Sequence, residues 1–95
     1  MKPDLKSKQI DELFEAILTL ETVEECYAFF NDVCTVNELQ ALSQRHHVAR
    51  LLMNNVTYSE IVENTGASTA TISRVKRSLN YGDGGYELTA KRINK

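Results

Sequence analysis

The spacing of hydrophobic residues along the chain predicts helices almost throughout. Hydrophobic residues recur at steps of three and four over residues 3–20 and 23–34, which is the period of one face of an α-helix. A longer run of this kind covers residues 36–55, and two short ones cover residues 58–65 and 69–80. The pattern therefore predicts an all-α protein with five helices over about these ranges.

Polar residues and glycines mark where these helices begin and end. In a capping box, Ser or Thr at the N-cap and Glu or Gln three residues later each satisfy a free backbone N–H. Three predicted helices begin with such a pair: Thr22 with Glu25, Thr35 with Glu38, and Thr57 with Glu60. Pro3 suits the first turn of the first helix, where its missing N–H costs nothing. We expect Gly82, Gly84 and Gly85 to end the fifth helix, and residues 86–93 to form a short helix or a frayed end.

The third predicted helix is apolar around much of its circumference. On a helical wheel, Val48 and Leu51 point away from Leu42, so apolar side chains must pack against the helix on more than one side. A chain of 95 residues has few other hydrophobic residues to bury all of these faces by itself. A homodimer with a shared core is the solution that we predict. The alternative is a compact monomer that leaves some leucines exposed.

The composition fits one small globular domain rather than a disordered or membrane protein. Hydrophobic residues make up 42% of the chain and charged residues 25%, which is ordinary for a folded domain. No apolar run approaches the roughly 18 residues of a spanning helix. A signal-peptide apolar region is missing from the start, MKPDLKSKQID. We expect a cytoplasmic protein, in which Cys26 and Cys34 are reduced thiols in a helical core.

The charge is divided unevenly between the two ends of the chain. Residues 1–67 hold 5 Lys or Arg against 11 Asp or Glu, whereas residues 68–95 hold 6 against 2. No acidic residue occurs from residue 64 to residue 82. Such asymmetry predicts that only the C-terminal third of the protein meets an anion. The alternative is a chance distribution of solvated charge.

A glycine-containing turn joins the fourth and fifth predicted helices. A turn of three or four residues with Gly, between two short helices, is typical of a helix-turn-helix. Gly66 stands where the fourth helix must stop, so a positive φ is expected there. Ser68 is placed to cap the fifth helix through a backbone N–H near Ala70 or Thr71. The small Ala67 lets the two helices approach closely.

The fifth predicted helix has two different faces. One face is apolar and can pack on Ile61, and it comprises Ile72, Val75 and Leu79. The opposite face begins with small and hydroxylated side chains and ends with cations: Ala70, Thr71, Ser73, Arg74 and Arg77. A recognition helix needs this order, because short side chains approach base edges and cations reach phosphates. The pattern predicts binding to double-stranded DNA, and docking to another protein is the alternative.

The residues of this region resemble the DNA-reading segment of the Trp repressor family, with the pattern G-A-x-x-A-T-I-S/T-R-x-x-x-S-L. The matching residues are Gly66, Ala67, Ala70, Thr71, Ile72, Ser73, Arg74, Ser78 and Leu79. Upstream, TVNELQALSQR is similar to the family's T-P-D-E-x-x-A-L-x-x-R, with matches at Thr35, Glu38, Ala41, Leu42 and Arg45. The resemblance covers roughly residues 10–80 and is specific over GASTATISRVKR.

The resemblance implies an all-α helical bundle that forms an intertwined homodimer with two helix-turn-helix heads, and a bacterial repressor of transcription. The organisation expected is one domain over residues 1–80, with a dimer core at 1–56 and a head at 57–80, followed by a tail at 81–95. To the DNA-contacting residues predicted on the fifth helix, the resemblance adds Ser59 of the fourth helix. The DNA-contacting residues expected are Ser59, Ser68, Thr69, Ala70, Thr71, Ser73, Arg74, Lys76 and Arg77.

The family's tryptophan corepressor lies between the head and the dimer core. The resemblance places Arg74, Arg45, Ser78 and Thr35 around the matching site. The tryptophan-binding member has glycine directly after the second arginine, where the indole packs, but this chain has Val75. Its branched side chain should fill that space, so we do not expect tryptophan to be the effector.

No other residue pattern predicts a catalytic or metal site. His46 and His47 are adjacent, and adjacent helical residues diverge by about 100° and cannot share a metal without a distant third ligand. We expect one of the two to be buried near Leu42 and the other exposed. No Ser-His-Asp or Cys-His arrangement stands out, so neither an enzyme nor a cofactor is predicted.

Overall fold

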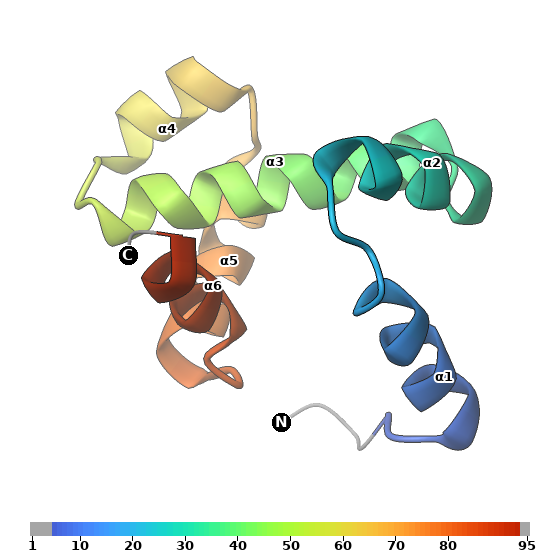
Figure 1. Cartoon of the computed structure of the whole chain (residues 1–95). Helices are drawn as coiled ribbons and strands as arrows, with labels where there is room; N and C mark the ends of the chain where they lie inside the picture. Colours follow the sequence, from blue (N-terminus) through green and yellow to red (C-terminus); the bar gives the residue numbers. More distant parts are fainter. Residues whose placement is uncertain (1–4, 94–95) are drawn as a thin grey trace. The chain divides into compact units, whose positions relative to one another are not determined.

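The computed structural model describes residues 5–93, and within them it has six helices and no strand (Figure 1). The helices are α1 (Lys8–Ile17), α2 (Val23–Val33), α3 (Val36–Met53), α4 (Tyr58–Thr65), α5 (Thr69–Tyr81) and α6 (Gly85–Ile93). The predicted all-α class is confirmed. Among the described residues, no helix has the length and apolar character needed to cross a membrane.

The bounds of α2 to α5 agree with the sequence-based prediction to within two residues, but those of α1 do not. The α1 helix begins at Lys8 because the Ser7 side chain accepts a hydrogen bond from the Ile10 N–H at 3.1 Å. Pro3, which was expected in the first helical turn, lies outside the described residues. At the other end, α1 stops at Ile17, before the expected Leu20.

The C-terminal segment forms a helix, which resolves the choice left open by the sequence. Gly82 ends α5 as predicted, and its N–H donates to the Ser78 carbonyl at 2.8 Å. Gly84 adopts a φ of +78°, in the left-handed region that suits glycine. Gly85 is the first residue of α6. Its predicted role in ending the fifth helix is therefore wrong.

Two of the three predicted capping pairs, Thr22 with Glu25 and Thr57 with Glu60, differ in one detail from a standard capping box. The Thr22 hydroxyl accepts from the Glu25 N–H at 3.0 Å, and the Glu25 carboxylate accepts from the Glu21 N–H at 2.8 Å. The Thr57 hydroxyl accepts from the Glu60 N–H at 3.3 Å and donates to the Glu60 carboxylate at 3.0 Å. The threonine caps are therefore confirmed, while the glutamates bind a neighbouring N–H or the threonine hydroxyl itself.

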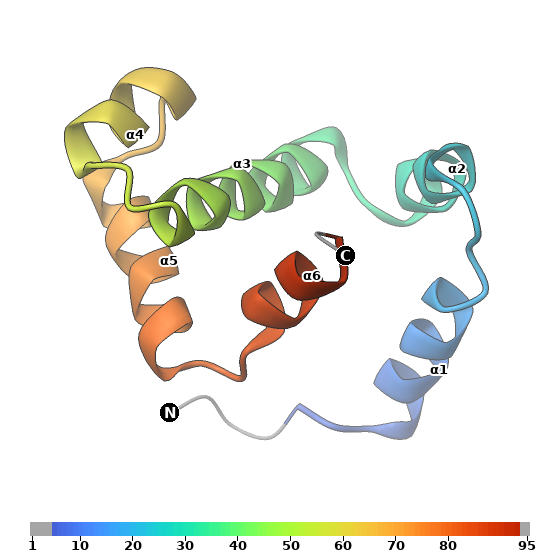
Figure 2. The same cartoon turned by 60° about the vertical axis from the view of Figure 1, so that its left-hand side comes forward.

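The described residues divide into two compact units, one that ends at residue 36 and one that begins at residue 37. The second unit contains a buried hydrophobic cluster, which we call the inner cluster. Its members come from α3, α4, the following turn and α5: Val48, Ala49, Ile61, Ala67, Ile72 and Val75. Figure 2 shows α4 and α5 joined by this turn beside the C-terminal half of α3. Leu79 and Tyr86 are half-buried against the cluster, so α6 also contributes to this unit.

The inner cluster buries part of the apolar surface of α3 that was expected to be buried by a second copy of the chain. Val48 and Ala49 are completely buried by residues of their own chain. Leu42 remains 44% exposed on the same helix. The apolar circumference of α3 is therefore a weaker sign of a dimer than the sequence alone indicates.

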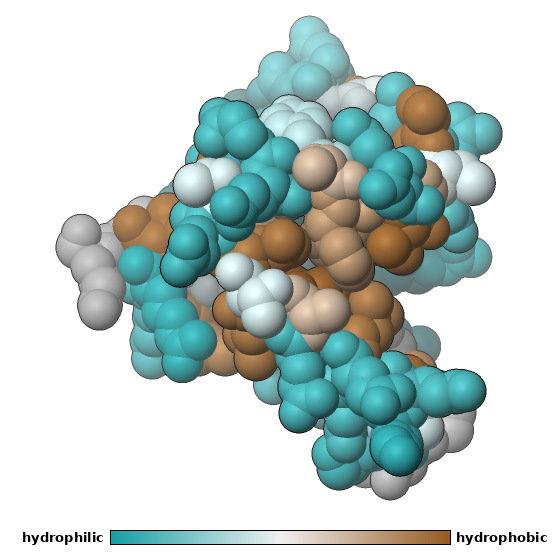
Figure 3. Space-filling model, turned by 45° about the vertical axis from the view of Figure 1, so that its right-hand side comes forward, coloured by the Kyte–Doolittle hydropathy of each residue, from teal (hydrophilic) through white to brown (hydrophobic). Residues whose placement is uncertain are grey.

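The first unit leaves most of its hydrophobic side chains exposed. Neither α1 nor α2 has a buried residue. Six large hydrophobic side chains of residues 8–36 are more than half exposed: Phe14, Leu18, Val23, Tyr27, Val33 and Val36. Hydrophobic side chains also lie open among hydrophilic ones on the face drawn in Figure 3. Both cysteines are free thiols, but Cys26 is exposed and Cys34 half-buried, so the expected burial of Cys26 in a core is not met within this chain.

Candidate nucleic-acid interface

The turn between α4 and α5 reverses the chain over three residues. Gly66 follows Thr65 with a φ of +69°, and its N–H donates to the Val62 carbonyl at 2.9 Å. Ala67 is buried, and its N–H donates to the Thr65 hydroxyl at 3.0 Å. The positive φ predicted for Gly66 is confirmed. The small side chain of Ala67 lies within the inner cluster, as close helix packing requires.

Ser68 fixes the start of α5. Its hydroxyl accepts from the Thr71 N–H at 3.1 Å and donates to the Thr71 hydroxyl at 3.1 Å. The predicted cap is thus confirmed at Thr71. Both hydroxyls are tied to each other at the beginning of the helix, where short side chains were expected to approach bases.

The left-handed turn makes a direct prediction for the stability of the second unit. Valine at position 66 would have to adopt a φ that β-branched residues avoid, so Gly66→Val is expected to destabilise the fold by about 1–3 kcal/mol. Apart from chain neighbours, no heavy atom lies within 4 Å of the place where a Cβ would stand. The cost is therefore one of backbone conformation and not of a clash.

Urea unfolding of Gly66→Val and Gly66→Asn measures this cost. Asparagine adopts the left-handed conformation more readily, so Gly66→Asn should unfold closer to wild type. Equal midpoints for Gly66→Val and wild type would contradict the assigned turn.

The burial pattern confirms the predicted division of α5 into two faces. Ile72 and Val75 are buried and Leu79 is half-buried, in the same cluster as Ile61. The residues of the opposite face and its flank are exposed: Thr69, Ala70, Ser73, Arg74, Lys76 and Arg77. Ser59 of α4 is exposed as well, and Thr71 is half-buried. One side of α5 thus holds the helix in place, and the other is open to a partner.

The exposed face of α5 carries three cations that form no ion pair with a carboxylate of residues 5–93. Among the described residues, Lys6 and Asp11 form an ion pair, and both lie far from α5 in the sequence. Arg74, Lys76 and Arg77 have no acidic partner within the described part of the chain. Uncompensated positive charge on an exposed helix attracts anions from solution.

Two contacts that position this region were not found from the sequence. The Lys76 ammonium lies 5.9 Å from the centroid of the Tyr58 ring, at the start of α4. The Gln44 side-chain amide of α3 donates to the Thr65 carbonyl at 3.3 Å, and so satisfies a carbonyl that the end of α4 leaves free. Each contact joins two different helices. The spacing of residues along a single helix therefore could not predict either of them.

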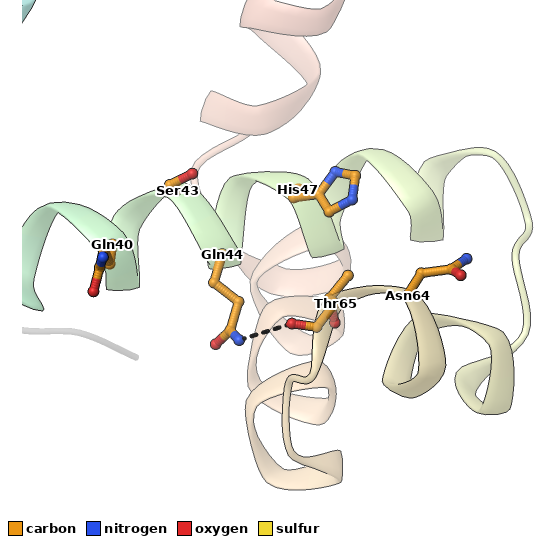
Figure 4. A pocket seen from close by; sticks show the side chains of 6 residues that line it. All are labelled: Gln40, Ser43, Gln44, His47, Asn64 and Thr65. Atoms are coloured by element: carbon orange, nitrogen blue, oxygen red, sulfur yellow. Dashed lines mark hydrogen bonds between the residues drawn. The ribbon is translucent and has the colours of Figure 1, made fainter.

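The residues expected around an effector are not gathered at the hollow that α3 and the end of α4 form in the second unit. Arg45 and Arg74 are exposed and Ser78 is half-buried, while Thr35 belongs to the first unit. Val75 is only 3% exposed and lies in the inner cluster. The hollow has a volume of about 300 Å³ and is lined by Gln40, Ser43, Gln44, His47, Asn64 and Thr65 (Figure 4). It shares no residue with the expected effector set.

His46 and His47 are both exposed on α3. The expectation that one of them is buried near Leu42 is therefore wrong. Val48 and Ala49, the next residues along the helix, occupy its buried side instead. Among residues 5–93, no group of three or more potential ligands is placed to hold a metal ion.

Comparison with known proteins gives consistent matches over nearly the whole chain. The sequence model of the family described as Trp repressor protein matches residues 8–94. The chain is 55% identical over 91 residues to the uncharacterised protein YerC of Bacillus subtilis (strain 168), covering 96% of this chain and 88% of that one.

Two solved structures have closely similar folds. A crystal structure of a candidate Trp repressor from Staphylococcus aureus matches with a TM-score of 0.92 and 57% identity, over 95% of this chain and 90% of that one. A TrpR-like protein from Eubacterium eligens matches with a TM-score of 0.92 and 54% identity, over 95% and 93%.

Proposed function

This chain belongs to the Trp repressor family, and from that premise we propose that it is a transcriptional regulator that binds double-stranded DNA and represses transcription. The observation that carries the proposal is the exposed face of α5. It bears cations that form no ion pair within the described part of the chain, while the opposite face packs in the inner cluster. A helix anchored in this way can lie in the major groove of DNA without losing its support.

The order of side chains along α5 assigns different roles to its two ends. Thr69 and Ala70 stand in the first turn and are short and exposed, so the backbone there can approach base edges. Ser73 follows on the same face. Lys76 and Arg77 lie later, where long cationic side chains reach the phosphates that flank the groove. The early residues therefore select the sequence, and the late residues supply affinity for any DNA.

The proposed regulator acts as a homodimer. Phe14 of α1, Leu18 at its C-cap and Tyr27 of α2 are large hydrophobic side chains that are more than half exposed in the single chain. A second copy that covers them would remove this apolar surface from water. A two-fold symmetric dimer carries two heads, so its operator is palindromic.

Loss of Arg77 is expected to weaken binding to all DNA sequences by a similar factor. Each phosphate contact contributes about 0.9 to the slope of log K against log salt concentration. The Arg77→Ala dimer, which lacks one contact per head, should therefore have a slope smaller in magnitude by about 2. Fluorescence anisotropy titrations of labelled duplexes over a range of KCl concentrations measure the slope.

The matched control for this experiment is Arg92→Ala, which removes the same exposed side chain from α6. The control should keep the wild-type slope. An unchanged slope for Arg77→Ala would show that this end of α5 does not face the phosphates.

We further propose that tryptophan does not gate this regulator. Val75 is 3% exposed and packed in the inner cluster, and an added ligand in a filled site overpacks it at a cost of about 1–3 kcal/mol. We expect 1 mM tryptophan to change neither the melting temperature nor the affinity for DNA. A ligand with a Kd of about 1 µM would stabilise the fold by about 4 kcal/mol at that concentration, which thermal unfolding detects easily.

The Val75→Gly variant is the companion to this test. It should lose stability, because it deletes a buried side chain, and it can then be titrated with indole. Saturable micromolar binding of tryptophan to the wild-type protein would overturn the proposal.

A further inference from the structure

The start of α4 and the middle of α5 meet through an aromatic ring and a cation. Tyr58 is the first residue of α4 and is 38% exposed, and the Lys76 ammonium lies 5.9 Å from the centroid of its ring. The position of Tyr58 is fixed, because Thr57 caps α4 and Ile61 anchors the helix in the inner cluster. The ring is thus held on a rigid element beside the exposed face of α5.

A ring in this place restricts a side chain that is otherwise flexible. The negative face of the ring attracts the ammonium but is only a weak hydrogen-bond acceptor. The ammonium N–H groups directed away from the ring therefore remain available to donate hydrogen bonds to a phosphate. Lysine has a flexible four-carbon side chain and loses conformational entropy when it binds a phosphate. Because the ring already restricts the ammonium in the free protein, less entropy is lost when DNA binds.

The surroundings of the pair leave the cation free to act on an external anion. Lys76 has no carboxylate partner among the described residues. Glu60, an acid of the same helix as Tyr58, accepts a hydrogen bond from the Thr57 hydroxyl at 3.0 Å. Arg77, next to Lys76, adds a second exposed positive charge.

We propose that Tyr58 is a positioning residue that holds the Lys76 ammonium ready for a DNA phosphate, and that the ring contact persists in the complex. The inference rests on the proposed function and adds to it a residue that contacts DNA through another side chain. The alternative role for Tyr58 is direct, through a hydrogen bond from its phenol hydroxyl to the DNA.

Three variants separate these roles: Tyr58→Leu removes the ring, Tyr58→Phe keeps the ring without the hydroxyl, and Lys76→Gln removes the cation. A cation–π contact at an exposed site corresponds to about a two- to fivefold change in affinity. For a dimer with two heads, Tyr58→Leu should therefore weaken binding by about 4- to 25-fold. It should also lower the salt slope toward that of Lys76→Gln, which a purely structural defect would not do.

The conservative variant and the double variant complete the experiment. Tyr58→Phe should bind like wild type, and Tyr58→Leu combined with Lys76→Gln should bind no more weakly than Lys76→Gln alone. A loss with Tyr58→Phe equal to that with Tyr58→Leu would assign the role to the hydroxyl and overturn the proposal. Additive losses in the double variant would overturn it as well.

A measurement without DNA tests the ring contact itself. The ring current should shift the Lys76 side-chain protons upfield in the NMR spectrum of wild type and Tyr58→Phe, but not in that of Tyr58→Leu. An identical Lys76 spectrum in all three proteins would exclude the contact. If wild type binds no DNA sequence above background, the proposed function fails and this inference with it. If wild type binds and Tyr58→Leu has the same affinity and salt slope, only the role of Tyr58 is wrong.

Discussion

Replacing Ile72 with alanine is expected to lower the free energy of unfolding by about 2–5 kcal/mol. The Ile72 side chain is completely buried where α5 meets α4 and α3. Alanine removes its apolar contacts and leaves a cavity that the rigid surroundings fill only in part. Small domains are stable by only about 5–15 kcal/mol, so this loss is a large fraction of the total.

Urea unfolding followed by circular dichroism measures the effect, with Ile93→Ala as the matched control. Ile93 undergoes the same chemical change at the end of α6, where it is 74% exposed, and should shift the stability by less than about 0.5 kcal/mol. Ile72→Ala should also bind DNA less well, because the cavity loosens the support that the inner cluster gives to α5. Equal midpoints for the two variants would contradict the assignment of Ile72 to the anchoring face.

The second large effect is expected on the oligomeric state. Phe14 is 56% exposed on α1 in the single chain, and we expect a second copy to cover it. An aspartate in that interface would bury a charge without a partner, so Phe14→Asp should sediment as a single chain of 10.8 kDa, while wild type sediments at twice that mass. In the monomer, two helix-turn-helix heads no longer bind the operator together, so the avidity of the dimer is lost. Operator affinity should fall by about 10²- to 10⁴-fold.

Glu15→Asp is the control for this variant. It places an aspartate next to Phe14 without removing a hydrophobic side chain, and it should remain dimeric. Circular dichroism shows whether the helices of each variant are formed. A wild-type protein that sediments as one chain at micromolar concentration would contradict the proposed dimer.

The region from α4 to α5 was predictable because its determinants are local. Thr57, Gly66 and Ser68 each act on backbone groups within a few residues, so their types and order suffice to place both helix ends and the turn. The two faces of α5 follow from helical periodicity in the same way. The exposed residues of α5 proposed to contact DNA could therefore be named from the sequence, whereas Ser59 of α4 was named only from the family resemblance.

Features that depend on distant parts of the chain were not predictable in this way. The burial of Val48 and Ala49, which leaves both histidines of α3 exposed, depends on where α4 and α5 pack. The contacts of Tyr58 with Lys76 and of Gln44 with Thr65 exist only once that packing is formed. Local hydrogen bonding explains one further difference, because the Ser7 cap sets the start of α1 at Lys8. Gly85 begins α6 instead of ending the fifth helix.

Selection of bound sequences from a random pool of DNA duplexes tests the proposed function most directly. Purified wild-type protein is incubated with the pool at a fixed salt concentration, and bound duplexes are recovered, amplified and sequenced over several rounds. We predict a palindromic consensus whose half-sites lie about one helical turn apart, roughly 10 base pairs between centres. A pool that shows no enrichment over rounds in which the protein remains folded would contradict sequence-specific DNA binding.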